Sequence, residues 1–589
     1  MRRTDYCGEI TPQKIGERVT VCGWVQRQRD LGGLIFIDLR DRTGLIQLQF
    51  DESVEKEAFQ TAFTVRSEYV LEVSGTVAKR GGAVNPNLKT GMLEVLADSI
   101  KIWSKAKTPP FEIVENSNVN EELRLKYRYL DLRRPDLQGN ILMRHRITKI
   151  TRDYFDEQGF IEIETPILMK STPEGARDYL VPSRVHPGSF YALPQSPQIY
   201  KQLSMVAGFD RYMQIARCFR DEDLRADRQP EFTQIDLEMS FVDLEDVLAV
   251  GEGFMERLFR EICGRELQLP LPRLTYREAM ERYGSDKPDT RFGMELFDIS
   301  DIAAGCGFSV FSSAVQAGGS VRGINAPGGA GALSRKEIDK LTEHARGIGA
   351  KGLAFLRWTP EGITCPFSKF ISQEELQAIL ERAGAKEGDA LLFVADEKNS
   401  VVFGTLGALR LMVADKIGVE KNGYALLWIT EFPFFEWDKE QQIWVAMHHP
   451  FTAPLDECLP YLESDKGKVR AKAYDLVLNG VELASGSIRI TDPDLQGRIF
   501  KLLGLSEEEA HRKFGFLTDA FQYGAPPHGG MGLGLDRLVM QLLGLRNLRD
   551  VVAYPKVQNA SELMSECPSE VSAEQLRELG ITLLEQPEN

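Results

Sequence analysis

Cysteine is scarce in this sequence of 589 residues, and the motifs that would give it a structural role are missing. Only 8 cysteines occur, and none belongs to a C-x-x-C pair. The sequence therefore predicts neither a disulfide framework nor a zinc knuckle, and it fits a reducing compartment. The 7 histidines include no H-E-x-x-H motif. That absence gives no sign of a transition metal held by the protein.

Long apolar runs are missing as well. No run approaches the roughly 18 residues of a membrane-spanning helix. Residues 1–9 turn polar and acidic where a signal peptide would have its apolar core. We therefore expect a soluble, cytoplasmic protein with no membrane partner and no export signal.

Basic charge is in deficit over the whole chain. There are 71 Lys and Arg against 87 Asp and Glu, a net charge of −16, which excludes a generically basic nucleic-acid coat. Residues 1–107 differ, because they hold 16 basic and 14 acidic side chains. A polyanion would find this N-terminal region the least repulsive part of the chain.

Length and apolar content predict several domains, since 43% hydrophobic residues in 589 can bury more than one core. The first hundred residues are typical of a small barrel of five short strands. The strands are expected at Val19–Val25, Leu34–Arg40, Leu45–Phe50, Tyr69–Val77 and Leu93–Ala97.

Alternation within these strands predicts which side chains face outward. The outer face should carry Phe36, Asp38, Arg40, Gln47 and Gln49. An outward phenylalanine among amides and charges is typical of the stacking platform of an OB-fold. The alternative is that Phe36 only covers the rim of the barrel.

The rest of the chain shows a linker and an insertion. Thr108-Pro109-Pro110 reads as a linker, and a helix over Leu142–Gln158 and an extended segment over Phe160–Leu168 follow. The block 284–411 is richer in glycine. It holds a buried-looking strand, Ala390–Ala395, and two capping boxes, Ser334-x-x-Glu337 and Ser372-x-x-Glu375. None of the chemical motifs lies in this block, so we expect a domain inserted into the catalytic one, with its glycines in turns.

Polar residues concentrate in three distant segments, which are 172–178 with 191–201, then 218–236, then 530–537. Arginines beside a dense carboxylate cluster suit a polyphosphate held with a divalent metal ion. Glycines before Arg537 allow a backbone or a flat ring to approach closely. A solvated helix face is the alternative for 218–236, but the strand-like flanks Tyr212–Phe219 and Phe232–Leu237 favour a charged loop between paired strands.

These segments resemble the three motifs of class II aminoacyl-tRNA synthetases. The stretch with Gly159 and Pro166 is similar to motif 1, Phe219–Glu222 to motif 2, and Gly530–Arg537 to motif 3. Residues 220–234, Gln195–Lys201 and Gly23-Trp24-Val25 narrow the resemblance to the bacterial-type aspartyl-tRNA synthetases, over nearly the whole chain.

The resemblance implies a multidomain α/β (α+β) fold. It consists of an N-terminal five-stranded OB-fold barrel, a class II catalytic domain built on an antiparallel sheet, and an inserted α+β domain of bacterial type. The implied divisions are an anticodon-binding domain over 1–107, a hinge over 108–140, a catalytic domain over 141–284 and 413–556, the insertion over 285–412 and a C-terminal extension over 557–589.

The resemblance also implies roles for individual residues. Catalysis would rest on Arg220, Glu482 and Arg537. Aspartate would be bound by Glu174, Ser196, Gln198, Lys201, Arg220, Asp236, His448 and Arg489. ATP would be bound by Arg220, Asp221, Glu222, Gln229, Glu482, Gly534, Leu535, Asp536 and Arg537. Mg²⁺ would be held by Asp475 and Glu482. The anticodon would meet Arg27, Arg29, Leu31, Phe36, Gln47, Gly82 and Glu94. For His448 a purely structural role stays open.

The implied activity is ATP-dependent ligation of L-aspartate to tRNA-Asp by a homodimer joined through motif 1. Asparaginyl and lysyl synthetases are rivals of similar fold. A lysyl pocket should place acids where Lys201 and Arg489 stand, and an asparaginyl pocket should need less positive charge. A non-catalytic RNA-binding paralogue would need neither Arg220 nor Arg537.

Two loop positions bear on whether tRNA-Asn is also charged. Leu31 resembles the type that charges tRNA-Asp alone, whereas Gly81-Gly82 resembles the relaxed type. Of the two, the sequence favours the strict type.

Overall fold

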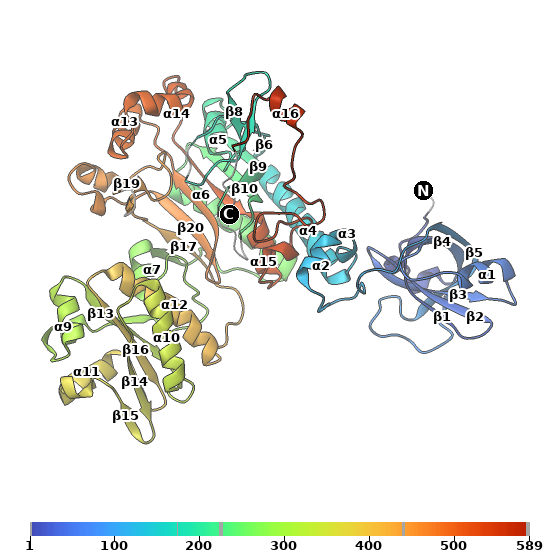
Figure 1. The fold of residues 1–589 in the computed structure, drawn as a ribbon, viewed down its shortest axis with the longest axis horizontal. Helices are drawn as coiled ribbons and strands as arrows, with labels where there is room; N and C mark the ends of the chain where they lie inside the picture. The colour runs from blue at the N-terminus through green and yellow to red at the C-terminus, as the bar shows by residue number, and fades with distance from the viewer. Residues whose placement is uncertain (1–2, 173–174, 223–227, 439–441, 585–589) are drawn as a thin grey trace. The chain divides into compact units, whose positions relative to one another are not determined.

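The computed structural model describes residues 3–172, 175–222, 228–438 and 442–584. The chain divides into two compact units (Figure 1). The barrel unit comprises 1–148, 223–230 and 542–576, and the sheet unit comprises 149–222, 231–541 and 577–589. None of the helices in the described ranges is long and apolar enough to cross a membrane.

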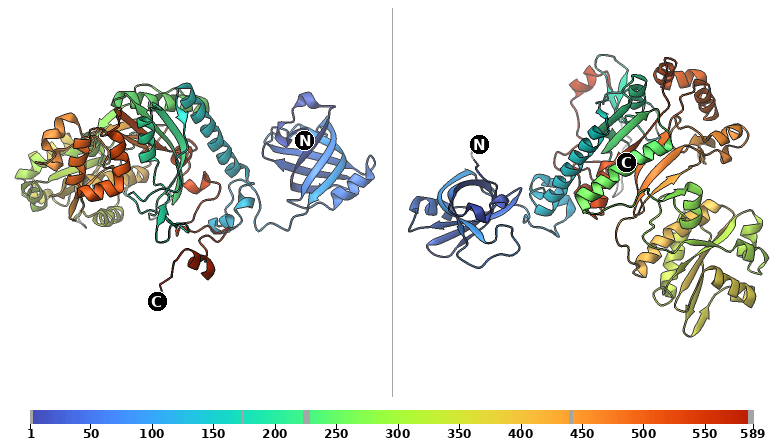
Figure 2. Two further views of the ribbon diagram at one scale, coloured as in Figure 1. Left: turned by 90° about the horizontal axis from the view of Figure 1, so that it is seen from above. Right: turned by 180° about the vertical axis from the view of Figure 1, so that it is seen from behind.

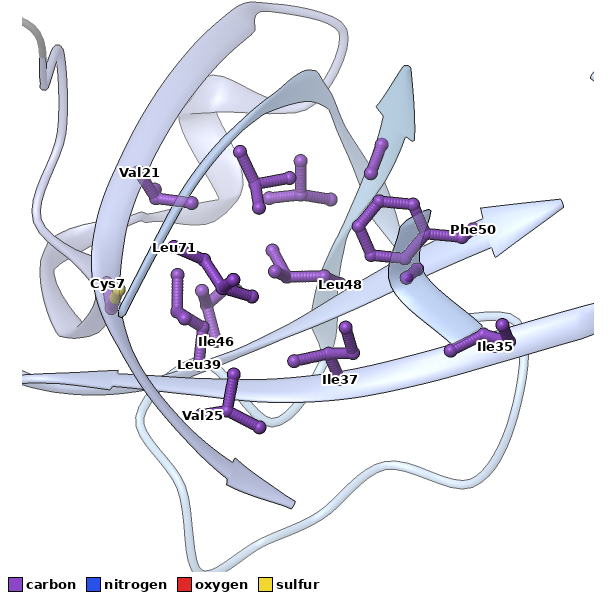
Figure 3. Packing of buried hydrophobic residues seen from close by; sticks show 14 of the residues in the cluster. Cys7, Val21, Val25, Ile35, Ile37, Leu39, Ile46, Leu48, Phe50 and Leu71 are labelled. Atoms are coloured by element: carbon purple, nitrogen blue, oxygen red, sulfur yellow. The ribbon is translucent and has the colours of Figure 1, made fainter. Parts of the chain in front are cut away.

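The barrel unit begins with five strands that close in the order β1-β2-β3-β5-β4, which confirms the expected barrel (Figure 2). The strands are β1 Arg18–Asp30, β2 Leu34–Asp41, β3 Gly44–Asp51, β4 Val70–Lys79 and β5 Leu93–Ser104, with helix α1 at Lys56–Phe63. Strand β5 runs past the expected end at Ala97 because it pairs with β4 as far as Ser104. Alternate residues such as Ile35, Ile37 and Leu48 fill the interior (Figure 3).

Two outward-facing residues are buried nonetheless, contrary to simple alternation. Arg40 is covered by Glu68, whose carboxylate oxygens Oε1 and Oε2 accept from Arg40 Nη2 at 3.0 and 2.9 Å. Glu68 also accepts from Arg133 of the hinge at 2.8 Å. Gln47 is covered by the polar network described below. A buried charge of this kind persists only when it is paired.

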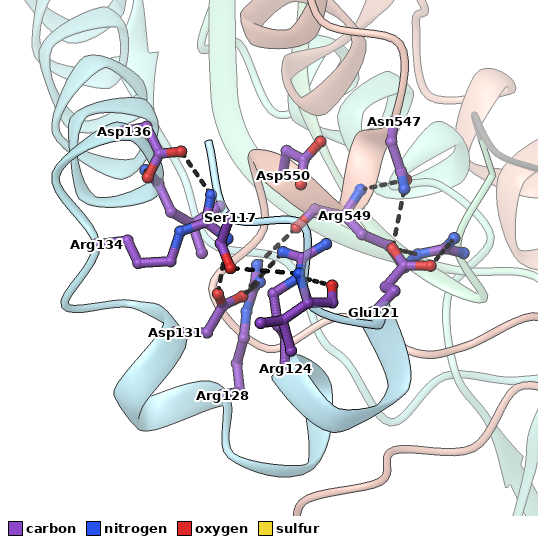
Figure 4. A network of polar contacts seen from close by, with 12 residues as sticks. Ser117, Glu121, Arg124, Arg128, Asp131, Arg134, Asp136, Asn547, Arg549 and Asp550 are labelled. Atoms are coloured by element: carbon purple, nitrogen blue, oxygen red, sulfur yellow. Dashed lines mark hydrogen bonds and ion pairs between the residues drawn. The ribbon is translucent and has the colours of Figure 1, made fainter. Parts of the chain in front are cut away.

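The helices after the barrel are α2 Glu121–Lys126, α3 Arg128–Asp131 and α4 Pro135–Glu157, which begin in the region expected to be the hinge. Helix α4 begins seven residues before the expected Leu142, with Pro135 at a first-turn position where its missing N–H costs nothing. Arg128 donates to the carbonyl oxygens of Arg549, Val552 and Ala553 at 2.7–2.9 Å (Figure 4). Helix α3 therefore holds the segment that follows motif 3.

The sheet unit is built on eight strands in the order β11-β17-β20-β21-β22-β10-β9-β6 (Figure 1). All neighbours are antiparallel except the two edge pairs, β11 with β17 and β6 with β9. The strands are β6 Ile161–Glu162, β9 Arg211–Phe219, β10 Glu231–Ser240, β11 Arg273–Thr275, β17 Leu426–Thr430, β20 Ala473–Leu478, β21 Val481–Ile488 and β22 His528–Gly534. The antiparallel sheet and the strands flanking the charged loop confirm the prediction.

The strand at this edge of the sheet is short. The extended segment Phe160–Leu168 contributes only the two residues of β6 to it. Pro166 has no N–H to give to a ladder, so the pairing with β9 ends early.

Helices and short ribbons surround the sheet. The helices are α5 Gln198–Val206, α6 Leu244–Leu258, α7 Tyr276–Tyr283, α13 Pro493–Leu502, α14 Glu507–Phe521 and α15 Leu535–Leu542. A further helix, α16 Ala573–Glu578, follows near the C-terminus. The ribbons pair β7 Leu180–Pro182 with β8 Phe190–Ala192, and β18 Phe435–Asp438 with β19 Ile443–Ala446.

The inserted block forms its own five-stranded sheet in the order β12-β13-β16-β14-β15. A separate sheet agrees with the expected inserted α+β fold. Its strands are β12 Leu296–Asp298, β13 Ser320–Ala326, β14 Ala354–Thr359, β15 Gly362–Thr364 and β16 Ala390–Asp396. Its helices are α8 Ser300–Gly305, α9 Ser309–Gln316, α10 Arg335–Ile348, α11 Gln373–Arg382 and α12 Asn399–Lys416. Separate apolar cores lie under α10 with α12, and under α8, α9 and α11. Gly318 and Gly328 adopt positive φ in turns, as expected.

Candidate active site

The centre of the candidate site is the contact between β10 and β22. In this pair Asp236 lies opposite Gly532 and Glu238 lies opposite Gly530. A Cβ on Gly530 would come within 2.3 Å of a carboxylate oxygen of Glu238, and a Cβ on Gly532 within 3.3 Å of one of Asp236. The glycines of motif 3 therefore leave room for two carboxylates on the neighbouring strand.

Two buried cations face these carboxylates. Lys201, on α5, places its Nζ 3.0 Å from Asp236 Oδ1 and 3.3 Å from Glu238 Oε2. Arg489, which follows β21, donates from Nε and Nη2 to the two oxygens of Glu238 at 2.9 and 3.1 Å. All four side chains are buried. We call Lys201, Asp236, Glu238 and Arg489 the charge quartet, whose formal charges cancel.

Every N–H of the Arg489 guanidinium has an acceptor. Besides Glu238, it donates to Ser487 Oγ at 2.6 Å, to His449 Nε2 at 2.7 Å and to the carbonyl oxygen of Gly530 at 3.2 Å. Glu238 is the only charged acceptor among them, so Nη1 donates to neutral groups alone.

The pKa values of the two acids in the charge quartet are shifted in opposite directions. Burial raises the pKa of Asp236 to about 6, although Lys201 opposes this shift. For Glu238 the effect of burial is outweighed by Arg489 and Lys201, so its pKa is lowered. Glu238 is the acid with two cationic partners, which is why it stays ionised more firmly.

Two histidines border Arg489. Burial and the Arg489 charge lower the pKa of His448 to about 4 and place that of His449 well below its usual value. The His448 ring packs edge-on against Phe432, with centroids 4.8 Å apart. His448 Nε2 is buried without a hydrogen-bond partner in the described chain. Both rings are therefore neutral at pH 7.

Asp475 and Glu482 form a second acidic pair, on the β20–β21 hairpin. The register sets Glu482 opposite Val477, and Val477 shares a face of β20 with Asp475, so both acids lie on one face. Burial and the Glu482 carboxylate raise the pKa of Asp475 well above its usual value. Its Oδ1 is buried and accepts no hydrogen bond from the described residues. Such a pair fits a divalent cation, which takes oxygen ligands.

Residues of motifs 2 and 3 lie around this hairpin. Arg537 Nη1 donates to the carbonyl oxygen of Glu482 at 3.3 Å. The Arg220 guanidinium lies over the Phe232 ring, 5.1 Å from its centroid, and Arg220 Nε is buried without a partner in the described chain. Asp221 pairs with Arg177 through a backbone bridge and a contact of 3.6 Å.

The other residues predicted to bind ATP have structural contacts of their own. The Asp536 carboxylate accepts from the backbone N–H of Thr233 at 2.9 Å, which fixes the start of α15 against β10. Gly534 and Leu535 mark the end of β22 and the start of α15, and Glu222 follows Asp221. Gln229 belongs to the barrel unit, where its amide exchanges two hydrogen bonds with the main chain of Lys556.

The start of α5 brings further predicted residues to the charge quartet. Ser196 and Gln198 flank its first turn, and Gln198 Nε2 is buried without a partner in the described chain. Gln195 holds the loop at 176–178 by bonding both main-chain groups of Ala176 and the carboxylate of Asp178. Glu174 lies outside the described residues.

On the barrel, four of the predicted anticodon residues form one polar network. Arg29 lies 5.8 Å from the Phe36 ring centroid and donates to Gln47 at 3.1 Å, and Gln47 donates to Glu94 at 2.7 Å. Arg80 and Asp38 belong to it as well, through Gln47 and Arg29. Arg27, Leu31 and Gly82 are exposed beside it. The face carries cations, amides and one half-exposed ring, which suits RNA bases.

Two models of known protein families match this chain. Residues 120–558 match the family model described as tRNA synthetases class II (D, K and N), and residues 19–103 match the OB-fold nucleic acid binding domain. The first match covers most of the chain. The chain belongs to the class II tRNA synthetases of the D, K and N group.

Full-length relatives of this class II synthetase carry two different names. It is 59% identical to the aspartate–tRNA ligase of Ruminiclostridium cellulolyticum over 99% of its length and 98% of the relative's. It is 58% identical, with the same coverage, to the aspartate–tRNA(Asp/Asn) ligase of Anoxybacillus flavithermus.

Solved structures share the synthetase fold at low sequence identity. Asparaginyl-tRNA synthetase from Pyrococcus horikoshii complexed with asparaginyl-adenylate superposes with a TM-score of 0.58 at 19% identity, covering 94% of this chain and 98% of that one. Aspartyl-tRNA synthetase from Entamoeba histolytica gives 0.56 at 18% identity, covering 92% and 89%.

The candidate site includes residues that no motif in the sequence pointed to. Glu238 and His449 both contact Arg489, and Ser487 does so too. Glu238 had a readable signal, because Gln234, Asp236 and Glu238 alternate on one face of β10. His449 had only its place beside His448.

Proposed function

We propose that this class II synthetase is an aspartate–tRNA ligase. It activates L-aspartate with ATP, which gives aspartyl-adenylate and pyrophosphate, and it then transfers aspartate to the 3′ end of tRNA-Asp. The observation that carries the proposal is the pair of buried cations, Lys201 and Arg489, in the site. Aspartate has two carboxylates and needs more cationic partners than asparagine or lysine, each of which has one. Full-length relatives named as aspartate–tRNA ligases support it.

The aspartate side-chain carboxylate is proposed to bind at Arg489 Nη1. The acceptors there, His449 and Ser487, are neutral, so a substrate carboxylate replaces them with a charge-assisted contact. Glu238 meanwhile keeps Nε and Nη2 in place. Lys201 and His448 border the same carboxylate, and Glu174, Ser196, Gln198 and Asp236 accept or border the substrate ammonium group.

Adenylate formation needs no strong base in this account. An oxygen of the aspartate α-carboxylate attacks the α-phosphorus of ATP, and the bond from that phosphorus to the bridging oxygen of pyrophosphate breaks. Arg220 and Arg537 supply positive charge to the phosphates, with Asp221, Glu222, Gln229 and the 534–536 turn around the nucleotide. The ribose hydroxyl of tRNA then displaces AMP from the acyl carbon. The rate comes from positioning and charge neutralisation.

Asp475 and Glu482 are proposed to hold Mg²⁺ with the ATP phosphates. Two carboxylates suit this ion, because Mg²⁺ usually takes one or two from the protein and its other ligands from phosphate and water. When bound, the ion neutralises phosphate charge. The unbonded Oδ1 of Asp475 supports this assignment.

The barrel is proposed to read the anticodon with Arg27, Arg29, Leu31, Phe36, Gln47, Gly82 and Glu94. Phe36 stacks on a base, and Gln47 bonds a base edge. We propose the domain division that the sequence predicts: an anticodon domain over 1–107, a hinge over 108–140, a catalytic domain over 141–284 and 413–556, an insertion over 285–412 and an extension over 557–589. In this division the anticodon domain binds tRNA, and the catalytic domain forms the adenylate and transfers aspartate.

Charging of tRNA-Asn is a second candidate function. Several relatives of 56–58% identity are named aspartate–tRNA(Asp/Asn) ligases, while Leu31 favours the strict type. Aspartate charging of purified tRNA-Asn decides between them, because a strict enzyme leaves tRNA-Asn uncharged.

We also propose a homodimer through motif 1, acting in the cytoplasm where ATP and tRNA are found. Exposed apolar side chains gather around motif 1, with Ile161, Ile167 and Leu168 each more than 40% exposed. Exposed apolar patches of this kind mark interaction surfaces. Light scattering on the purified chain tests it, since a dimer has twice the mass of 66.3 kDa.

The experiment that tests the amino-acid assignment is ATP–pyrophosphate exchange with aspartate, asparagine and lysine in parallel. Exchange with aspartate alone supports the proposal. Exchange with asparagine or lysine instead would reject it and favour one of the two related synthetases.

A further inference from the structure

Arg410 is a buried cation of the inserted domain that binds backbone instead of an acid. It lies on α12, is 1% exposed and donates to the carbonyl oxygens of Asp289, Phe292 and Gly293 at 2.7–3.0 Å, and to Met294 at 3.2 Å. Its guanidinium also stacks 4.0 Å from the Phe292 ring centroid. Burial lowers its pKa to about 10, so it is still charged at pH 7. One side chain thus fixes the path of residues 289–294.

Helix α12 touches the end of α7 just before this segment. A Cβ on Gly284 would lie 2.3 Å from the carbonyl oxygen of Phe403, and a Cβ on Gly407 would lie 2.4 Å from the carbonyl oxygen of Gly284. Both glycines are therefore required for backbone to meet backbone. Segment 285–294 is held by α12 at its start, through Gly407, and along its second half, through Arg410.

The same segment rests on the hairpin that carries the second acidic pair. Asp289 is buried and lies against the β20–β21 turn. Its two carboxylate oxygens accept hydrogen bonds from the Arg291 guanidinium at 2.7 and 2.9 Å. A Cβ on Gly480 in that turn would be 3.2 Å from Asp289 Cβ. Gly480 has φ +85°, a conformation that favours glycine. Glu482 is two residues beyond this turn.

Segment 285–289 also brings charge close to the acidic pair. Asp286 and Lys287 pair with each other at 3.3 Å. Both act on the Asp475 carboxyl, where Asp286 adds negative charge and Lys287 positive charge. The inserted domain therefore reaches the candidate metal pair through contacts that are all within the sheet unit.

We propose that Arg410 is a positioning residue for the Mg²⁺–ATP end of the site. By fixing residues 289–294, it holds Asp289 against the β20–β21 turn and so sets the spacing of Asp475 and Glu482. This gives the inserted domain a role in adenylate formation. The proposal rests on the assignment of that acidic pair to Mg²⁺ in the proposed function.

The test compares Arg410→Lys and Asp289→Asn with the wild type, all as full-length chains. Lysine keeps the charge of Arg410 but cannot bridge four carbonyl groups. Displacing a site by about 1 Å costs up to about a hundredfold, so the Mg²⁺ concentration for half-maximal exchange should rise roughly ten- to a hundredfold in both variants. The KM for aspartate should change less than about twofold, since the charge quartet is untouched. The double variant should cost no more than the larger single change, because both act through one segment.

Phe311→Leu is the matched control. Phe311 lies in the core under α8, α9 and α11, away from α12, so the substitution destabilises the inserted domain without touching residues 289–294. It should lower the melting temperature and leave the Mg²⁺ requirement unchanged. The proposal is overturned if Phe311→Leu raises the Mg²⁺ requirement as Arg410→Lys does. It is also overturned if Arg410→Lys raises the KM for aspartate as much as the Mg²⁺ requirement, or if Arg410→Lys leaves the Mg²⁺ requirement unchanged.

A second readout separates this proposal from the proposed function. The rise in melting temperature when ATP is added should need a higher Mg²⁺ concentration in both variants than in the wild type. If the wild type shows no exchange with aspartate, the proposed function fails. The Mg²⁺ dependence of the ATP-induced rise in melting temperature still decides the role of Arg410. If Arg410→Lys does not fold, Asp289→Asn carries both measurements.

Discussion

Arg489 is the residue on which selectivity for aspartate depends in this account. Replacing it by leucine leaves the substrate carboxylate partly unpaired in a closed pocket, which costs about 3–5 kcal/mol. Exchange with aspartate should fall on the order of 10²- to 10³-fold, while ATP affinity changes little. Steady-state exchange against each substrate measures this.

Arg489→Lys is the control for that prediction. It keeps a positive charge beside Glu238 but loses the pair of hydrogen bonds from the guanidinium to the two oxygens of Glu238. It should lose less activity than Arg489→Leu and keep the fold. An unchanged KM for aspartate in Arg489→Leu would remove this residue from the pocket.

His448 predicts a pH dependence of stability. Its pKa is lowered from 6.5 to about 4 in the folded chain by burial, and Arg489 adds to the shift. Between these values the unfolded chain takes up the proton more readily, so stability is complete above pH 6.5 and falls on acidification. Lowering the pH from 7.5 to 5.5 should cost the wild type about 1 kcal/mol more than it costs His448→Gln.

Urea unfolding of both chains at the two pH values measures this difference. His344→Gln, at an exposed position on α10, is the control and should keep the wild-type loss. An equal loss in the wild type and His448→Gln would mean that His448 is not held neutral.

The sequence identified most residues of the charge quartet but not its pairing. Lys201, Asp236 and Arg489 followed from the resemblance, and Glu238 did not. Its contact with Arg489 spans 251 residues of sequence. It arises because β22 lies between β21 and β10 in the sheet, an order that no local pattern contains.

At the scale of elements, the β20–β21 hairpin carries the acidic pair that is proposed to hold Mg²⁺. Glu482→Gln removes one hard oxygen charge from the pair and should abolish most adenylate formation while leaving tRNA affinity intact. Glu457→Gln, at an exposed position, should change neither. Exchange assays and tRNA binding on the same preparations test this, and an equal loss of tRNA binding would indicate a folding defect.

The barrel gives a separate prediction for tRNA. Stacking of a base on an aromatic ring contributes about 1–3 kcal/mol, so Phe36→Ala should weaken aminoacylation about ten- to a hundredfold through the KM for tRNA. Pyrophosphate exchange should be unchanged. Phe63→Ala, an exposed phenylalanine on α1, is the matched control. An equal fall of both activities in Phe36→Ala would contradict the role of this face.

Elements were predictable where local patterns decide them. Alternation gave the barrel strands, and the reciprocal capping box of Ser372 and Glu375 marks the start of α11 as expected. The short length of β6 within segment 160–168 was not predictable, because its pairing with β9 involves residues about 50 positions further along the chain. The burial of Arg40 depends on Glu68, which lies outside the strands at positive φ.

For the whole molecule, the two reactions are expected to depend on two different surfaces. Exchange is expected to need the charge quartet, the acidic hairpin that Arg410 is proposed to position, and the motif arginines, whereas charging is expected to need the barrel as well. Variants of the barrel should therefore separate the two reactions, and variants of the charge quartet should lower both.

The most direct test of the central claim is charging of purified tRNA by the full-length chain with labelled amino acids. With ATP and Mg²⁺ present, we expect tRNA-Asp to accept aspartate, and we expect no transfer of asparagine or lysine to their tRNAs. Transfer of asparagine or lysine, or no transfer of aspartate to tRNA-Asp by a folded chain that binds ATP, would contradict it.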